Sequence, residues 1–539
     1  MMGLSKLKPF IFVVIIVALG FIAYSDSMSG KFIRDDDSLI VDNSVVKSWA
    51  NISGIFTKDN ISTSTGKTFQ FYRPVQIITY MYDYSLWGLD PKGYHITNIL
   101  LHVLAALVLF WFLNTLCRDS AISFVASTLF IVHPVHSEVV SYISGRADAL
   151  SLSFILLAFI FYIKSLERRG PFFYAIAFFC YALALLSRES AMILPVLVIL
   201  CHYSFSGDVG SDNRKAGRLR RKFSPILFAG IVAITIAYIV LRTTYLKHLM
   251  PVYALSTTLT QRLPGFFVAL ANYIRLLFLP IGLHMEYGNK LFKFSDPIAL
   301  AGVAVLVFLL ALAFAARNKK RIVFFSVAWF LIALLPVSNL YPAGSYMAEH
   351  WLYLPSVGFF LIIAEAAAAI YKKRGLKIVS VGLVVVLAVF YCYLTARQNA
   401  YWAEPVAFYE TTLKHNLESP RAYNDLAIAY EKTGKHQEAI DVYTTMLRAD
   451  PKNPDVYVNL AAIYIIIGKN EEAVELCNRA ISLQPENATA HNNLAVAYYV
   501  LRKYDLAIKH CDLAVAYGYK VKPELLELLK FYRDDQQEY

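Results

Sequence analysis

Long apolar segments recur through the first 396 residues of this chain. Each is roughly 17–22 residues long, which lets a helix cross a hydrocarbon layer about 30 Å thick. The 539 residues are 57% hydrophobic and only 17% charged, with a mean hydropathy of +0.49, whereas soluble domains are about 25% charged. The pattern excludes an ordinary soluble protein. It predicts an all-α chain whose N-terminal domain, 1–396, is a polytopic membrane domain.

Basic residues cluster in short loops between these apolar segments, and by the positive-inside rule such loops face the cytoplasm. This arrangement accounts for the net charge of +12 without nucleic acid, and it places the polar C-terminal part outside. One further apolar stretch, 264–281, carries Asn272 and Arg275, so we expect it to be re-entrant or interfacial. The first span is either a cleaved signal peptide or an uncleaved anchor, and the many later spans favour the anchor. The expected spans, about eleven, cover residues 9–24, 94–116, 120–136, 148–165, 171–187, 191–206, 224–242, 298–316, 322–338, 352–371 and 377–396.

Residues 397–539 are polar and carry a period of 34 residues. A 34-residue period with fixed small and large positions resembles tetratricopeptide repeats, in which stacked helix pairs complete one another's core. We expect repeats at about 422–455, 456–489 and 490–520, with flanking helices. Such arrays offer a concave surface for peptides, and the alternative is a structural appendage that binds nothing. The residues that share the period are Leu426, Leu460 and Leu494; Tyr430, Tyr464 and Tyr498; and Ala439, Ala473 and Ala507.

Three consecutive acidic residues, Asp35 to Asp37, follow the first span. A carboxylate at this position would lie at the mouth of the bilayer, where a base acting on a lipid-borne substrate is needed. The alternative is a solvated exit from a membrane anchor. By the same topology, Arg73 and the pair Arg188–Glu189 fall on or near this face of the membrane. Ionisable residues at a membrane are candidates for function.

Two further motifs carry polar groups into predicted spans. His95, Asn98 and His102 follow helical spacing, so they share one face that looks to a wet cavity or to partner helices. The pair His133 and His136 has metal-ligand types, but the intervening proline and the lack of an obvious third ligand argue against a metal.

Charged residues also stand at span entrances. Arg146 and Asp148 occur in Gly-Arg-Ala-Asp, and Glu138 lies shortly before them. Arginine at a bilayer surface suits bidentate binding of a phosphate. The segment 347–356, Met-Ala-Glu-His-Trp-Leu-Tyr-Leu-Pro-Ser, adds further charge to the same side.

Taken in order, these motifs and the repeats resemble the transmembrane and tetratricopeptide-repeat-containing family of O-mannosyltransferases and its bacterial relatives, which belong to the GT-C class of glycosyltransferases. The resemblance covers nearly the whole chain and implies a polyprenyl- or dolichyl-phosphate sugar donor. In the animal members the sugar is mannose and the acceptor is a protein hydroxyl. The family's acidic pair matches Asp35 and Asp36. His350 stands where the family has arginine, and histidine is only partly charged at neutral pH.

The resemblance implies an inverting sugar transfer on the non-cytoplasmic face. Asp35 or Asp36 would take the proton of the acceptor hydroxyl. Some GT-C enzymes use a divalent metal with an acidic loop residue, but this sequence offers no convincing ligand set and we predict none. The expected phosphate-binding residues are Arg146, Arg73, Arg188 and His350. The expected cavity-lining residues are His95, Asn98, His102, His133, His136, Glu138, Asp148, Glu189, Glu349 and Tyr353.

The expected partners are the lipid-linked donor, a protein or peptide acceptor held by the repeats, and the bilayer, with no nucleic acid. The short array and the lack of a retention signal favour a bacterial inner membrane with the repeats in the periplasm, or the endoplasmic reticulum membrane in a eukaryote. Two alternatives remain. One is transfer to a cell-envelope glycan or lipid, and the other is a non-enzymatic scaffold or transporter.

Overall fold

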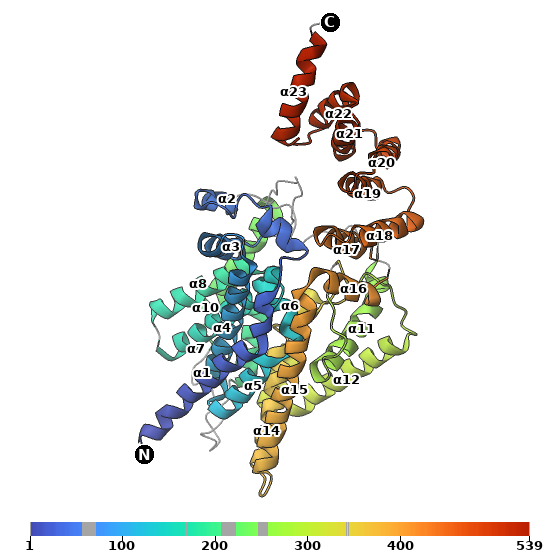
Figure 1. Cartoon of the computed structure of the whole chain (residues 1–539). Coiled ribbons are helices and arrows are strands. Elements are labelled where there is room, and N and C mark those ends of the chain that lie inside the picture. The colour runs from blue at the N-terminus through green and yellow to red at the C-terminus, as the bar shows by residue number, and fades with distance from the viewer. Residues whose placement is uncertain are drawn as a thin grey trace. The chain divides into compact units, whose positions relative to one another are not determined.

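The computed structural model describes residues 2–56, 72–168, 170–205, 223–245, 257–340, 342, 344–417 and 419–537, and over these residues its regular elements are all helical, as predicted. The chain divides into two compact units, Met1–Glu404 and Pro405–Tyr539 (Figure 1). We expected the division after residue 396. It falls later because helix α15 continues from Lys377 to Ala403.

Each predicted span of the first unit corresponds to an apolar helix or to a pair of helices. Within the described residues, six helices are long and apolar enough to cross a membrane, and one bent pair adds a seventh candidate. The number that do cross stays a prediction. The helices are α1 (Met2–Tyr24), α2 (Ile52–Ile55), α3 (Pro74–Trp87), α4 (Pro91–Cys117), α5 (Ser120–Val132), α6 (Ser137–Val140), α7 (Ala147–Arg168), α8 (Pro171–Ser187), α9 (Leu194–Phe205), α10 (Pro225–Val240), α11 (Leu259–Phe278), α12 (Pro297–Ala316), α13 (Arg321–Leu334), α14 (Ser356–Tyr371) and α15.

Small residues let the helices of this unit approach closely. A Cβ on Gly302 of α12 would lie 1.9 Å from the carbonyl oxygen of Phe267 on α11. A Cβ on Gly358 of α14 would lie 2.3 Å from the carbonyl oxygen of Ser326 on α13. Contacts of this kind are typical of membrane helices, whose association depends on packing because lipid is as apolar as their side chains. The helix pairs therefore leave no room for larger residues at these two sites.

The bent pair lies at the segment predicted as one span, 120–136. Helix α5 ends at Val132, and the chain turns by 57° before it continues to Val140. Pro134 causes the break because proline lacks an N–H and disfavours a helical conformation at the preceding residue. His133 supports the new turn, since its Nδ1 accepts a hydrogen bond from the Val135 N–H at 3.2 Å.

The second unit consists of helix pairs at the predicted period. The alanines Ala439, Ala473 and Ala507 are fully buried. Gly434 (φ +74°) turns the chain in the left-handed conformation, whereas the third turn uses Arg502 at φ +58°. A residue with a Cβ is strained there, because only glycine adopts this region without steric cost. The helices are α16 (Pro405–His415), α17 (Pro420–Lys432), α18 (His436–Ala449), α19 (Pro454–Ile466), α20 (Asn470–Leu483), α21 (Ala488–Val500), α22 (Tyr504–Ala516) and α23 (Pro523–Gln537).

Candidate functional site

The acidic loop after α1 is fastened to the chain segment just before α7. Asp36 is fully buried, and its Oδ2 accepts a hydrogen bond from the Ile33 N–H at 3.1 Å. Its Oδ1 accepts the Ser144 N–H at 2.9 Å and also the Ser144 hydroxyl. Burial raises the pKa of Asp36 to about 7, although the hydrogen bonds from Ser144 and Ile33 oppose the shift. The side chain of Asp36 therefore anchors the loop.

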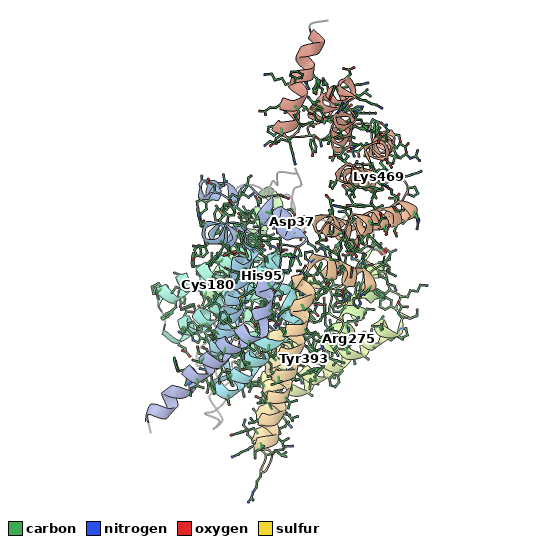
Figure 2. All side chains as sticks on the ribbon, viewed as in Figure 1. Asp37, His95, Cys180, Arg275, Tyr393 and Lys469 are labelled. Carbon is green, nitrogen blue, oxygen red and sulfur yellow. The ribbon has the colours of Figure 1, made fainter. Side chains whose placement is uncertain are left out.

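Asp35 lies beside this anchor but is only partly buried. Its N–H donates to the Tyr142 hydroxyl at 3.2 Å, and the Tyr142 ring stacks on Trp402 with centroids 5.7 Å apart. Figure 2 marks Asp37 of this loop and His95 of α4 toward the same end of the first unit. Of the two carboxylates predicted to act as the base, Asp35 is the one that reaches the surface.

Arg146 has protein partners on most of its guanidinium group. Its Nη1 lies 2.5 Å from Asp83 Oδ2 and 3.2 Å from Thr79 Oγ1, and its Nη2 donates to the Tyr94 carbonyl at 3.1 Å. The guanidinium carbon lies 4.6 Å from the centre of the Tyr80 ring. Both side chains of the Arg146–Asp83 pair have no exposed surface. In this structure Arg146 joins α3, α4 and α7, and it does not face an open site where we expected a phosphate.

Two other arginines form ion pairs nearer the surface. Arg73, at the N-terminus of α3, contacts Glu189 with Nη2 to Oε1 at 2.9 Å and Nε to Oε2 at 3.3 Å. Arg188 pairs with Asp148 at the start of α7. These side chains are 9–14% exposed. The Gly-Arg-Ala-Asp motif and the Arg188–Glu189 pair are thus in contact in the structure.

The third pair joins two motifs that are far apart in the sequence. Glu138 accepts hydrogen bonds from the His350 N–H at 2.9 Å and from His350 Nδ1 at 2.5 Å. Glu138 is within electrostatic reach of Arg188, and Asp148 is within reach of His350 and Arg73. Glu189 also interacts with Arg242. We call this set the charged cluster, and it comprises Arg73, Glu138, Asp148, Arg188, Glu189, Arg242 and His350.

Five of the ten predicted cavity-lining residues connect buried helices, namely Asn98, His102, His133, His136 and Tyr353. Asn98 donates from Nδ2 to the carbonyls of Val140 and Tyr142, and His102 contacts the Tyr353 hydroxyl at 2.7 Å. The remaining contacts are His102 Nε2 to the Ile131 carbonyl, His133 Nε2 to the Leu277 carbonyl, and His136 to the Phe130 carbonyl and the Ser356 hydroxyl. These residues form polar links between helices. For Asn98 and His102, contact with partner helices is the alternative to a wet cavity that their helical spacing left open.

His95 and Glu349 are buried in different surroundings. The His95 ring lies against Gly30, and its ring nitrogens have no hydrogen-bond partner among the described residues. Glu349 Oε1 accepts hydrogen bonds from the His284 N–H at 2.6 Å and the Tyr287 hydroxyl at 2.7 Å. Burial, together with the nearby Glu138 carboxylate, raises the pKa of Glu349 well above its usual range.

Two charged residues near these motifs escaped the sequence reasoning. Asp83 neutralises Arg146, and Arg242 joins the charged cluster at the end of α10. Each has a signal in the sequence, since Asp83 stands alone in an aromatic stretch and Arg242 ends a predicted span. Ionisable residues at such places need partners, but the sequence does not say which residues supply them.

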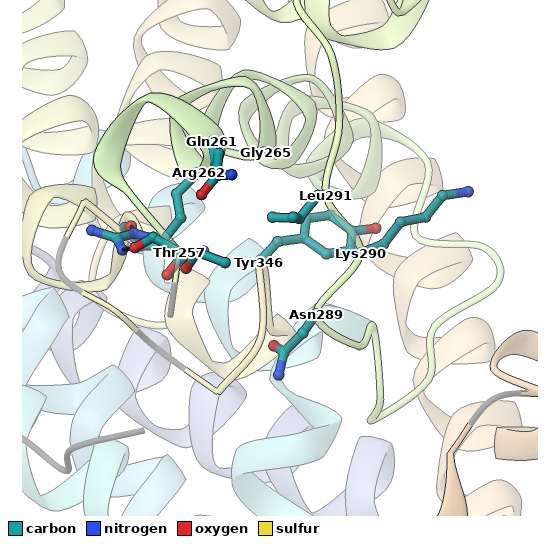
Figure 3. Close-up of a pocket in the computed structure, with 9 residues that line it drawn as sticks. Thr257, Gln261, Arg262, Gly265, Asn289, Lys290, Leu291 and Tyr346 are labelled. Carbon is teal, nitrogen blue, oxygen red and sulfur yellow. Dashed lines mark hydrogen bonds between the residues drawn. The ribbon is translucent and has the colours of Figure 1, made fainter. Parts of the chain in front are cut away.

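A separate pocket lies beside α11 (Figure 3). It encloses about 320 Å³, part of which is open to solvent, and it contains none of the predicted site residues. Arg262 in its wall donates to the carbonyls of Thr257, Asn339 and Leu340. The lining residues are Thr257, Gln261, Arg262, Gly265, Asn289, Lys290, Leu291, Asn339 and Tyr346. Among the residues that the structure describes, no three His, Cys, Asp or Glu side chains converge to hold a metal ion.

The second unit matches three family models, described as tetratricopeptide or TPR repeats, over residues 406–454, 432–479 and 462–501. An alignment that includes both units of the chain matches 462 residues with the mouse protein O-mannosyl-transferase TMTC3 at 27% identity. It covers 79% of this chain and 50% of that protein. The chain is similar to protein O-mannosyl-transferases over most of its length. The Drosophila melanogaster Tmtc3 protein is 26% identical, with 78% of this chain and 53% of the relative covered.

A third relative, the Caenorhabditis elegans protein O-mannosyl-transferase F38B6.6, is 28% identical and covers 74% of this chain and 57% of its own length. The chain thus spans about half the length of these transferases. Among solved structures, the apo oligosaccharyltransferase of Archaeoglobus fulgidus aligns over 77% of this chain and 59% of its own, at 12% identity and a TM-score of 0.44.

Proposed function

We propose that this protein is a membrane glycosyltransferase that moves a mannose-like sugar from a polyprenyl-phosphate donor to a hydroxyl group of a protein. The observation that carries the proposal is the charged cluster, which lies in the same unit as the partly exposed Asp35 in a relative of protein O-mannosyl-transferases. Buried charges are costly, and ionisable residues in membrane segments are therefore usually functional.

Asp35 is the general base in this proposal, and Asp36 positions it. The acceptor oxygen attacks the anomeric carbon while its proton passes to the Asp35 carboxylate. The bond from the anomeric carbon to the phosphate oxygen breaks, and its electron pair leaves with the lipid phosphate. Asp36 is unsuited to contact a substrate because it is fully buried and accepts hydrogen bonds from Ile33 and Ser144. Attack opposite the leaving group inverts the configuration at the sugar.

The arginines near the surface neutralise the leaving phosphate. Arg73 and Arg188 are slightly exposed, and each already holds a carboxylate. Glu189 and Asp148 keep the two guanidinium groups oriented. Arg146 is paired with Asp83 of α3, the helix whose N-terminal cap is Arg73. His350 adds a further donor beside Glu138.

The repeats hold the acceptor, and the reaction takes place on the non-cytoplasmic face. Basic loops between spans support this orientation, and a tethered acceptor gains in effective concentration near the active site. With this orientation, the protein would lie in a bacterial inner membrane with its repeats in the periplasm, or in the endoplasmic reticulum membrane of a eukaryote.

The experiment is a transfer assay with the full chain reconstituted in vesicles, polyprenyl-phosphate mannose as donor and Ser/Thr-containing peptides as acceptors. The wild-type protein should glycosylate the peptide, and Asp35→Asn should reduce the rate by about 10²–10⁴-fold, the usual contribution of a general base. The matched control Asp37→Asn, which removes the third carboxylate of the acidic loop, should retain most of the activity. Equal rates for wild type and Asp35→Asn would end the assignment of the base.

A further inference from the structure

Helix α3 leaves large apolar side chains on the surface of the protein. Its buried residues include Gln76 and Asp83, whereas Tyr82 and Leu86 are 56% and 55% exposed. Tyr82 and Leu86 are four residues apart, so they stand on one face of the helix. A helix in water places its apolar stripe toward the core and its charges outward. Helix α3 follows this rule where it buries Ile77, Tyr80 and Met81, but it also buries Asp83 and leaves Tyr82 and Leu86 exposed.

The two buried polar side chains of α3 are held by hydrogen bonds to other segments. Asp83 accepts hydrogen bonds from Arg146 at 2.5 Å and from the Thr97 hydroxyl at 2.6 Å. Gln76 donates to the Ser144 carbonyl at 2.8 Å. The polar side therefore cannot turn outward without exposing an ion pair and these hydrogen bonds. The orientation of α3 is fixed by its buried polar and apolar groups together, and a second set of apolar side chains is left on the surface.

Other apolar residues extend this surface. Trp49 is 45% exposed, and its Nε1 donates to Ser85 Oγ on the outer side of α3 at 2.6 Å. Trp87 and Leu89 at the end of the helix are each 43% exposed. We call Trp49, Tyr82, Leu86, Trp87 and Leu89 the α3 face. Contiguous exposed apolar groups of this kind mark a surface that is covered by a partner or by a membrane.

The length and position of α3 indicate what covers the α3 face. Its 14 residues span about 21 Å, less than the hydrocarbon thickness of about 30 Å, so it cannot cross a bilayer. Helix α4, a candidate span of 27 residues, begins at Pro91 directly after it. Tryptophan and tyrosine are enriched where a membrane meets water. Figure 1 shows α2 and α3 at the end of the first unit opposite the N-terminus.

We propose that the α3 face lies in the interfacial layer of the lipid bilayer, with the helix along the membrane surface on the side of the acidic loop. The lipid covers Tyr82 and Leu86 at the depth of the headgroups and the first acyl carbons. Because Arg73 is the N-terminal cap of α3 and Asp83 holds Arg146, this contact sets the height of both arginines relative to the lipid. The proposal is independent of the transferase activity.

The test places a fluorophore on the α3 face. The full chain with Leu86→Cys, or with Tyr82→Cys, is labelled with nitrobenzoxadiazole and reconstituted in phosphatidylcholine–phosphatidylglycerol vesicles. The vesicles carry a nitroxide either near the headgroup or near the end of the acyl chain. Val307→Cys, in the middle of span α12 and 60% exposed, is the lipid control, and Ser482→Cys in the repeats is the water control. Labelling of the wild-type cysteines, five buried and one partly buried, gives the background.

Interfacial helices insert about 5–10 Å below the headgroup surface. The label at position 86 should therefore emit as in an apolar medium, and the shallow nitroxide should quench it about twofold more than the deep one. Position 307 should show the reverse order, and position 482 should not be quenched. A label at 86 that behaves like 482 would overturn the proposal. A label that is shielded from water but not quenched by either nitroxide would overturn it too, because a protein surface such as a second copy would then cover the face.

Discussion

Replacing Asp35 and Asp36 separately with asparagine should produce two different defects. Asp36 is buried and receives hydrogen bonds on both carboxylate oxygens, from Ile33 and from Ser144. An asparagine can accept on only one side, because its other terminal atom is an NH₂ donor. Asp36→Asn therefore leaves either the Ile33 N–H or the Ser144 donors without an acceptor. Asp35 is partly exposed, so Asp35→Asn leaves this anchor intact.

The cost of Asp36→Asn follows from these bonds. A hydrogen bond to a charged acceptor contributes about 1.5–3 kcal/mol, and a buried donor without a partner costs about 1–3 kcal/mol. Relief from burying a charge offsets part of this, since the pKa of Asp36 is raised to about 7 by burial. We expect a net loss of about 2 kcal/mol of stability. For Asp35→Asn we expect less than about 0.5 kcal/mol, which is usual for surface substitutions.

Two assays on the same preparations separate the roles. Thermal unfolding should show a lower transition temperature for Asp36→Asn and no change for Asp35→Asn. The rate of sugar transfer, measured below both transition temperatures, should fall about 10²–10⁴-fold for Asp35→Asn. It should fall less for Asp36→Asn. The reasoning is refuted if Asp36→Asn melts like the wild type, or if it loses more transfer activity than Asp35→Asn.

Three further predictions follow from other parts of the structure. Arg73→Lys loses the two-point contact with Glu189, and the KM for the donor should rise about tenfold; an unchanged KM would contradict its role. Because burial raises the pKa of Asp36 from 3.8 to about 7, the folded state takes up a proton. The contribution of Asp36 to stability, taken as the difference between wild type and Asp36→Asn, should therefore be greatest below about pH 4 and be lost as the pH rises through 7; a difference that does not change with pH would contradict this. Arg502→Gly should stabilise the repeats by about 1 kcal/mol, and Gly434→Ala should destabilise them by a similar amount in denaturant unfolding, since both turns have positive φ; opposite signs would be evidence against strain.

The helices were predictable from the sequence because their signal is local. Runs of apolar residues define the membrane helices, and the 34-residue period defines the repeats, whose family models match. The break at Pro134 lay within a segment that we predicted as one span. Its signal, a proline after an apolar run, was present, but hydropathy alone does not register it.

The roles within the candidate site were less predictable, since they depend on partners distant in the chain. Asp35 and Asp36 are alike in sequence and differ only because Ser144, 108 residues away, binds Asp36. Arg146 was our first choice for the phosphate, and the structure gives it Asp83 as partner. Such pairings arise from tertiary packing, which a single sequence does not encode in any local pattern. The assignment of the base and of the phosphate-binding arginines therefore stays a prediction.

The account depends most on the acidic loop and the repeats sharing one aqueous compartment opposite the cytoplasm. Single cysteines at the exposed positions Lys47 and Ser482, with Lys319 in a basic loop as control, can be tested with a membrane-impermeant maleimide in intact cells. We predict that positions 47 and 482 are labelled from outside, and that position 319 is labelled only after the membrane is opened. Labelling that placed 47 and 482 on opposite sides of the membrane would contradict the proposed enzyme.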